Sequence, residues 1–261
     1  MSDDEGAASS PTGAAALLQP PLRFSGIIAS AGRLQAACLR QTLIPLAVLS
    51  LFLSLTPVLL ALDAADNLLL PLAFLLIVVL PTVLFSFAFG VISVALDDLV
   101  EGHTPSFRRA YRTLAPRRRD VLVGALLAGM LSLTLAALLL PLWPLFKVLF
   151  FGPPVLVQVV ALEGHDVRGG WPRLQALMRG HWARIIMCLI AVSLGIALLE
   201  NTALGVAAQM LEDAPRAVAL AILLPMQMLL VGFLYSFAAA VGYVCYYDVR
   251  ARAEDGSAAV E

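Results

Sequence analysis

Charged side chains are scarce in this sequence. Asp, Glu, Lys and Arg together make up 13% of the 261 residues, and the net charge is −1, whereas about a quarter of the residues in soluble domains are charged. Apolar residues make up 61%, and a soluble chain of this size could not hide so much apolar surface from water. The composition therefore predicts a membrane protein, and the near-zero net charge gives no reason to expect a nucleic-acid partner.

Cysteines and enzyme signatures are also few. Cys38, Cys188 and Cys245 lie far apart and form no CxxC pair, so neither a disulfide framework nor a cysteine metal site is expected. The sequence has no GxSxG motif, no P-loop and no GxGxxG motif, which are common signatures of hydrolases and nucleotide-binding enzymes. We therefore expect a protein that is not an enzyme and needs no cofactor.

The apolar residues are gathered in long runs. About 20 helical residues cross a bilayer core of about 30 Å, and one run is so long that we divide it at its Pro-Leu-Trp-Pro turn. The six expected spans cover about residues 43–62, 67–96, 121–141, 145–162, 184–208 and 217–247. The expected fold class is an all-α integral membrane protein, with a six-helix domain over residues 21–252, a disordered cytoplasmic tail over 1–20 and a cytoplasmic tail over 253–261.

The basic residues are unevenly distributed. Lys147 is the only lysine, and fifteen of the seventeen basic residues fall in segments that the six spans place on one side of the membrane. These segments are residues 1–42, 97–120, 163–184 and 248–261. Loops rich in Lys and Arg stay in the cytoplasm, so both termini are expected there. The preference for Arg over Lys is typical of GC-rich bacterial genomes, and we expect a multi-pass protein of the bacterial cytoplasmic (inner) membrane.

Two of the inner segments resemble each other. The sequence Glu-Gly-His occurs at residues 101–103, after the second expected span, and again at 163–165, after the fourth. Each copy is followed by an aromatic residue, a basic amphipathic segment and another apolar run, and residues 23–41 form a weaker third copy of the basic segment. The pattern predicts a threefold repeat of helical hairpins that all enter the membrane in the same direction.

The two Glu-Gly-His sequences contain the residue types of a metal site. Glu101, His103, Glu163 and His165 would lie at equivalent places at the cytoplasmic ends of their spans, and imidazole with carboxylate suits Zn²⁺ or Fe²⁺. The alternative is that the glycines are helix C-caps and that the polar residues mark the membrane boundary. The sequence has no HExxH motif to favour the metal site.

The basic segment over residues 171–182 predicts an interfacial helix. Its apolar residues recur every three or four positions, and Arg173 and Arg179 fall mainly on the other side. Such a helix lies with its apolar side in the headgroup boundary and its arginines toward phosphate. Each arginine near an anionic leaflet contributes about 1 kcal/mol. The segment is expected either to fix topology alone or to bind anionic lipid headgroups.

Polar residues and helix breaks inside the spans are the main indications of transport. Gln158 and Gln227 lie in the fourth and sixth spans, and Gly152, Pro153 and Pro154 interrupt the fourth. A broken membrane helix exposes backbone carbonyls that bind a substrate in some transporters. The alternative is that the glutamines bond neighbouring helices and that the prolines only set curvature.

Two short motifs carry a family resemblance. The last span ends in Tyr-Tyr-Asp-Val-Arg (residues 246–250), and Arg-Gly-His-Trp (residues 179–182) precedes the fifth span. With these motifs the chain resembles a broad bacterial family of membrane domains, which includes domains fused to some glycerophosphoryl diester phosphodiesterases and stand-alone six-helix relatives. The resemblance implies a six-helix membrane fold with a poorly defined function. It does not imply phosphodiesterase activity, which belongs to a separate catalytic domain for which this chain has no room.

The C-terminal motif also predicts a structural clamp formed by Tyr247, Asp248 and Arg250. Tyrosine suits the membrane interface, and Asp248 is expected to pair with Arg250 or with an arginine of the basic segments. This pairing would fix the end of the last span to the cytoplasmic loops.

The leading hypothesis is a non-enzymatic polytopic inner-membrane protein that acts as a scaffold, a partner subunit or a lipid-interacting module. One alternative is a small-molecule or lipid transporter that uses the kinked fourth and sixth spans. The other is a metal-dependent membrane enzyme at the Glu-Gly-His sequences. The expected partners are membrane lipids, anionic headgroups among them, and a membrane-protein partner or a second copy of the chain.

Overall fold

The computed structural model describes residues 18, 22–39, 42–43, 46, 80–138, 154–179 and 181–258. All regular structure in this part of the chain is helical, and no strand occurs within it. The all-α prediction is therefore confirmed for the described residues. The first expected span, most of the second before Leu80, and the boundary between the third and fourth spans lie outside them.

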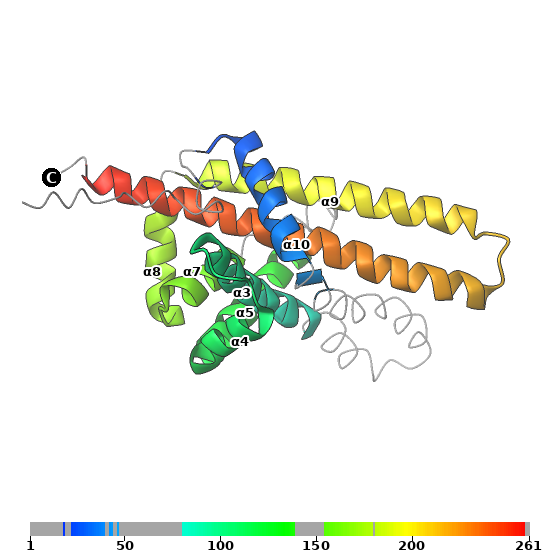
Figure 1. Ribbon diagram of the computed structural model, residues 1–261, viewed down its shortest axis with the longest axis horizontal. Helices are drawn as coiled ribbons and strands as arrows, with labels where there is room; N and C mark the ends of the chain where they lie inside the picture. Colours follow the sequence, from blue (N-terminus) through cyan, green and yellow to red (C-terminus); the bar gives the residue numbers. More distant parts are fainter. Residues whose placement is uncertain are drawn as a thin grey trace, which may run out of the picture.

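Figure 1 shows the described helices in chain order. Residues 24–39 are helical. The later elements are α3 (Leu80–Val100), α4 (Phe107–Leu114), η4 (Ala115–Arg117), α5 (Arg118–Leu138), α7 (Pro154–Glu163), α8 (Val167–Met178), α9 (Trp182–Met210) and α10 (Arg216–Ala258). A short helix with outward arginines (α4) lies between two 21-residue helices, and α8 lies between the ten residues of α7 and the 29 residues of α9. The threefold repeat of hairpins stays a prediction.

Two described helices are long and apolar enough to cross a membrane. The apolar stretches are Val83–Val100 in α3 and Ala221–Ala253 in α10, and Leu194–Met210 in α9 is a shorter one. The expected number of six spans stays a prediction. α10 is longer than expected, because it continues to Ala258 through the sixth span and into the stretch assigned to a C-terminal tail.

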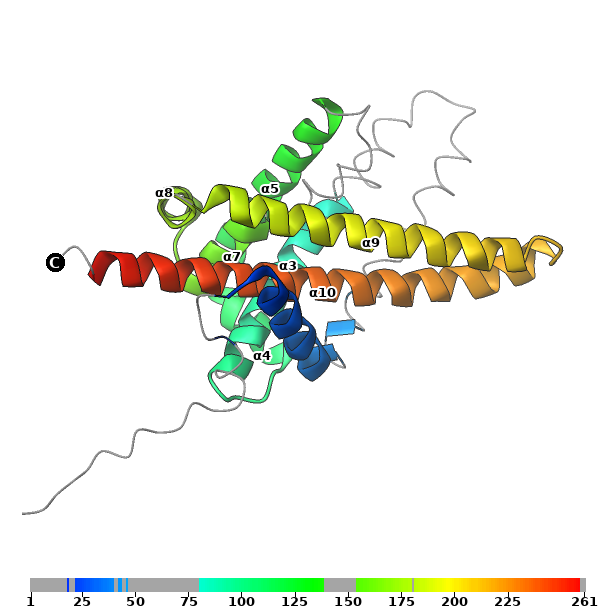
Figure 2. The same cartoon turned by 90° about the horizontal axis from the view of Figure 1, so that it is seen from above.

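α10 is the central helix of the structure. In both views α9 runs beside it in the opposite direction, and residues 24–39 cross its other side (Figures 1 and 2). The amide of Gln35 donates to the Phe233 carbonyl at 2.8 Å and to the Ser236 hydroxyl at 2.7 Å, which fixes the N-terminal helix to α10. Residues 238–246 of α10 are all buried, so the core of the described structure surrounds this part of the helix.

Two glycines allow the helices to approach closely. A Cβ atom at Gly90 of α3 would lie 3.1 Å from a methyl group of Val157 in α7, and one at Gly242 of α10 would lie 2.9 Å from the amide of Gln158. Small residues at such crossings allow membrane helices to pack by backbone contact. α7 is therefore held tightly between α3 and α10.

Three long helices carry large apolar side chains outward. Those at least 40% exposed are Leu122, Val123, Leu126, Leu127 and Met130 on α5, Met187, Leu194, Leu198, Leu199, Val206 and Met210 on α9, and Val218, Ile222, Leu229 and Phe233 on α10. Large exposed apolar patches are unusual on soluble monomers and mark a membrane or protein contact. At about 1.5 Å per residue, the 29 residues of α9 extend about 43 Å, which exceeds the thickness of a bilayer core.

Candidate functional site

Both Glu-Gly-His sequences end a helix. Gly102 and Gly164 are the described residues with positive φ, at 85° and 72°, a conformation that side-chain-bearing residues rarely adopt. After α3, the N–H of His103 donates to the Asp98 carbonyl at 2.8 Å and the N–H of Gly102 donates to the Leu99 carbonyl at 3.1 Å. This is the Schellman form of a helix C-cap, one of the two alternatives that the sequence left open for Gly102. Gly164 has the same positive φ at the end of α7.

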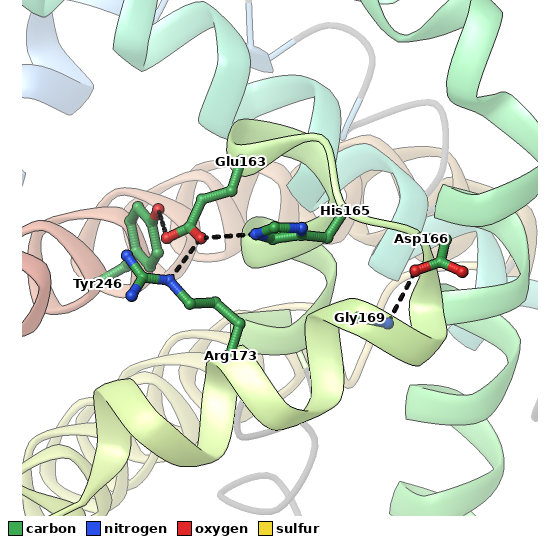
Figure 3. A network of polar contacts seen from close by, with 6 residues as sticks. All are labelled: Glu163, His165, Asp166, Gly169, Arg173 and Tyr246. Carbon is green, nitrogen blue, oxygen red and sulfur yellow. Dashed lines mark hydrogen bonds and ion pairs between the residues drawn. The ribbon is translucent and has the colours of Figure 1, made fainter.

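A capped amphipathic helix starts soon after each of these turns. At the start of α4, the Ser106 hydroxyl accepts from the N–H of Arg109 at 3.4 Å. At the start of α8, the Asp166 carboxylate accepts from the N–H of Gly169 at 2.8 Å (Figure 3). Ser and Asp are favoured N-caps because they satisfy backbone donors at a helix start. The chain therefore turns by the same local means in both repeats.

Glu163, the last residue of α7, is the centre of a polar network (Figure 3). One carboxylate oxygen accepts from Arg173 Nε of α8 at 2.7 Å and lies 3.4 Å from His165 Nε2. The other oxygen accepts from the Tyr246 hydroxyl of α10 at 2.7 Å. The Glu163 side chain is 9% exposed. The network therefore joins α7, α8 and α10 at one buried carboxylate.

The partners of Glu163 keep it ionised. Burial by itself would raise the pKa of Glu163, but hydrogen bonds from Arg173 and Tyr246 and the charges of Arg173 and Arg250 have the larger combined effect and hold this pKa below its ordinary value. Both carboxylate oxygens already accept a hydrogen bond, so a metal ion at Glu163 would have to compete with the contacts to Arg173 and Tyr246.

The first repeat has a related contact. The carboxylate of Asp97, near the end of α3, accepts from the Tyr243 hydroxyl at 2.7 Å, while the neighbouring Asp98 lies 3.7 Å from Arg109 Nε of α4. Tyr243 and Tyr246 are three residues apart on α10 and so lie on one side of it. Each therefore bonds an acidic residue at the end of a different repeat helix. These contacts were not predicted from the sequence, although the three-residue spacing of the tyrosines was a usable signal.

The four predicted metal ligands form two separate pairs. His103 Nδ1 lies 3.6 Å from a Glu101 carboxylate oxygen, and both side chains are exposed, whereas His165 pairs with Glu163. Among the described residues, the three acidic or histidine side chains with ligand atoms within 4.8 Å of one another are Asp98, Glu101 and His103. The structure therefore does not bring the four residues together, and metal binding stays a prediction.

Asp248 joins the N-terminal segment to α9 and α10. One carboxylate oxygen accepts from the backbone N–H of Leu22 at 2.8 Å. The other accepts from Arg252 Nε at 3.0 Å and lies 3.3 Å from a guanidinium nitrogen of Arg184, the third residue of α9. The Asp248 side chain is only 1% exposed. Of the predicted clamp residues, Asp248 thus binds an arginine of the preceding basic segment.

The other two predicted clamp residues lie close to the same helix end. The ring of Tyr247 lies 6.4 Å from that of Tyr243, centroid to centroid. Arg250 is exposed, and its positive charge contributes to the low pKa of Glu163. The C-terminal motif therefore contributes to both the Glu163 network and the Asp248 contacts.

The two glutamines proposed for transport lie far apart. The buried amide of Gln158 lies against α10. In the amide orientation that satisfies its neighbours, it donates to the Gly242 carbonyl at 3.2 Å and accepts from the Tyr243 N–H at 3.1 Å, so it binds α7 to α10. Gln227 precedes Gly242 by fifteen residues on α10, which corresponds to about 22 Å at about 1.5 Å per residue. The structure therefore does not bring Gln158 and Gln227 into one cavity.

The predicted break in the fourth span coincides with the start of a helix. Pro154 is the first residue of α7, a position where proline is favoured because its missing N–H would have no helical partner. Gly152 and Pro153 lie outside the described residues. Pro225, in the sixth expected span, lies inside α10, which continues through it.

The apolar side of α8 packs on the protein, in contrast to the expected burial in lipid. Leu174 and Leu177 are buried in the core, while Trp171 is 45% exposed. Arg173 binds Glu163, and Arg179 is the exposed C-cap residue of α8. Of the two arginines proposed as lipid ligands in this segment, Arg173 is thus held in an ion pair within the protein.

The arginines of α4 form the exposed basic surface of the first repeat. Ala110 and Leu114 face the core, whereas Arg108 and Arg112 are exposed on the other side of this helix. A shallow hollow of about 510 Å³ on this surface is lined by Ser106, Arg108, Arg109, Arg112 and Thr113. These groups offer guanidinium and hydroxyl donors, which suit phosphate oxygens.

Comparison with known proteins gives no assignment for this chain. No family model, no curated protein and no solved structure matches it. The resemblance to the membrane domains of the phosphodiesterase family therefore stays a prediction, and the function is argued from the contacts above.

Proposed function

We propose that the protein is a non-enzymatic, multi-pass protein of the bacterial inner membrane that acts as a lipid-interacting module, with both termini in the cytoplasm. The observation that carries this proposal is the basic surface of α4. Its inward residues Ala110 and Leu114 fix the helix to the core, and its outward arginines Arg108 and Arg112 point away from it. An arginine near an anionic leaflet contributes about 1 kcal/mol, so these two contribute about 2 kcal/mol.

Further support comes from the exposed apolar faces of α5 and α9, because lipid tails satisfy such surfaces. Two of the polar groups that suggested catalysis or transport have structural partners. Glu163 binds Arg173 and Tyr246, and Gln158 binds backbone groups of α10. These contacts favour the lipid-interacting module over the metal enzyme and the transporter.

The experiment measures thermal unfolding of the full chain in lipid nanodiscs. One set of discs contains phosphatidylcholine, and the other contains equal parts of phosphatidylcholine and phosphatidylglycerol. The proposal predicts that the anionic discs stabilise the wild-type protein and that the double variant Arg108→Gln/Arg112→Gln loses most of this gain. The matched control Arg108→Lys/Arg112→Lys keeps the charge and should keep most of the gain. Equal stability of the wild-type protein in the two kinds of disc would contradict the proposal.

A further inference from the structure

A second surface, distinct from the α4 hollow, lies between α3 and α5. It is a shallow groove of about 390 Å³ lined by Val83, Arg118, Arg119, Leu122, Val123 and Leu126. Val83 is the contribution of α3, and the other residues belong to the first three turns of α5. The walls are almost entirely apolar, and both arginines lie at the end where α5 begins.

We propose that this groove binds one anionic phospholipid. The guanidinium groups of Arg118 and Arg119 hold the phosphate, and one acyl chain lies along Leu122, Val123 and Leu126. This inference rests on the proposed function, because it requires that a bilayer covers this side of α5. It adds a single defined site to the collective attraction of the α4 arginines.

The order of the groups along α5 carries the argument. Arg118 and Arg119 come directly after η4, at the start of the helix, where the chain is expected to enter the membrane. Leu126 lies seven residues beyond Arg119, about 10 Å along the axis. In an anionic phospholipid a charged headgroup is followed by an apolar acyl chain, which matches the order of the charged and apolar residues along α5. Arg also binds phosphate with two parallel hydrogen bonds, which a lysine cannot form.

The side chains that line the groove favour a phospholipid over free phosphate or a peptide. The residues beyond the arginines are Leu and Val, and they are 41–42% exposed at Leu122, Val123 and Leu126. Free phosphate would use the two arginines and leave this apolar surface in water. A peptide would bring backbone N–H and C=O groups to walls that offer no partner, at a cost in free energy. A phospholipid places its phosphate at the arginines and covers the Leu and Val side chains with an acyl chain.

The test is native mass spectrometry of the full chain released from nanodiscs made of equal parts of phosphatidylcholine and phosphatidylglycerol. The wild-type protein is expected to retain one phosphatidylglycerol molecule. Arg118→Gln/Arg119→Gln should weaken this binding about 25-fold, if each lost arginine contact contributes about fivefold. Val123→Phe keeps both arginines and fills the groove, so it should also lose the lipid. It serves as the second variant if the arginine variant does not fold.

Arg108→Gln/Arg112→Gln is the matched control, because it removes the same charge from α4 and leaves the groove intact. It should keep the bound phosphatidylglycerol while losing the general stabilisation by anionic discs. The inference is overturned if the wild-type protein retains no lipid, or if the folded arginine variant or Val123→Phe retains it as the wild type does. In each of these cases the proposed function still stands if anionic discs stabilise the wild-type protein through α4, so the two failures are distinguishable.

Discussion

The contribution of Glu163, in the second Glu-Gly-His sequence, to the free energy of unfolding can be measured through its hydrogen-bond network. The variant Glu163→Gln keeps the size of the side chain and removes its charge, so Arg173 loses its ion pair and Tyr246 donates to a neutral oxygen instead of a carboxylate. A hydrogen bond to a charged group contributes about 1.5–3 kcal/mol, and the contribution of Arg173 is smaller because its side chain is 36% exposed. We expect the free energy of unfolding to fall by about 2 kcal/mol at neutral pH.

A double-mutant cycle with Tyr246→Phe tests whether this loss comes from the network. Tyr246→Phe removes only the hydroxyl that bonds Glu163, and we expect it to cost about 1–2 kcal/mol. Because Glu163→Gln weakens the hydrogen bond that Tyr246→Phe removes, the double variant should lose about 1 kcal/mol less than the sum of the two. The measurement is equilibrium unfolding in mixed detergent micelles, followed by circular dichroism.

The pH dependence gives an independent check. The pKa of Glu163 is lowered in the folded protein, so its contribution to stability is complete above the ordinary glutamate value of about 4.3 and is lost as pH falls through the lower folded-state pKa. The stability difference between the wild-type protein and Glu163→Gln should therefore shrink in acid.

The matched control for both measurements is Glu101→Gln in the first repeat. Glu101 is 62% exposed and lies 3.6 Å from His103, and such surface pairs contribute little. The reasoning is refuted if Glu163→Gln costs no more than Glu101→Gln, or if the Glu163→Gln protein keeps the full acid sensitivity of the wild-type protein.

Three further variants test the helix contacts by the same unfolding assay. Gly164→Ala should cost about 1–3 kcal/mol, because φ is 72° there and an added Cβ would lie 2.5 Å from the Arg117 guanidinium; an unchanged stability would contradict the C-cap. Asp248→Ala should cost about 2–3 kcal/mol, less than a fully buried pair because Arg184 is 36% exposed; a loss below about 1 kcal/mol would argue against the clamp. Gln158→Leu should cost about 1 kcal/mol by removing a bond between helices, whereas a gain in stability would show that this bond contributes nothing.

The features that could be predicted from the sequence are local ones. Apolar runs specify long helices because each span must bury its own backbone polar groups, and Gly102 and Gly164 mark helix ends because a positive φ favours glycine. None of these predictions required knowledge of which helices touch.

The contacts of the site depend on tertiary packing and could not be derived in this way. Asp248 binds the backbone of Leu22, 226 residues away in the sequence, and Tyr246 bonds Glu163 across 83 residues. No pattern of spacing fixes such pairs. Arg173 illustrates the consequence: its place on an amphipathic segment suggested a lipid ligand, but α8 packs on the core and directs this arginine to Glu163.

The most direct test of the account asks whether the α9–α10 hairpin crosses the bilayer away from the arginine surface of α4. Arg112→Cys places a thiol on the exposed side of α4, and Glu212→Cys places one in the exposed turn between α9 and α10. The three native cysteines are buried, so a membrane-impermeant thiol reagent should report the new ones in sealed inner-membrane vesicles of each orientation. The account predicts labelling of Arg112→Cys only from the cytoplasmic side and of Glu212→Cys only from the opposite side. Labelling of both from the same side would contradict it.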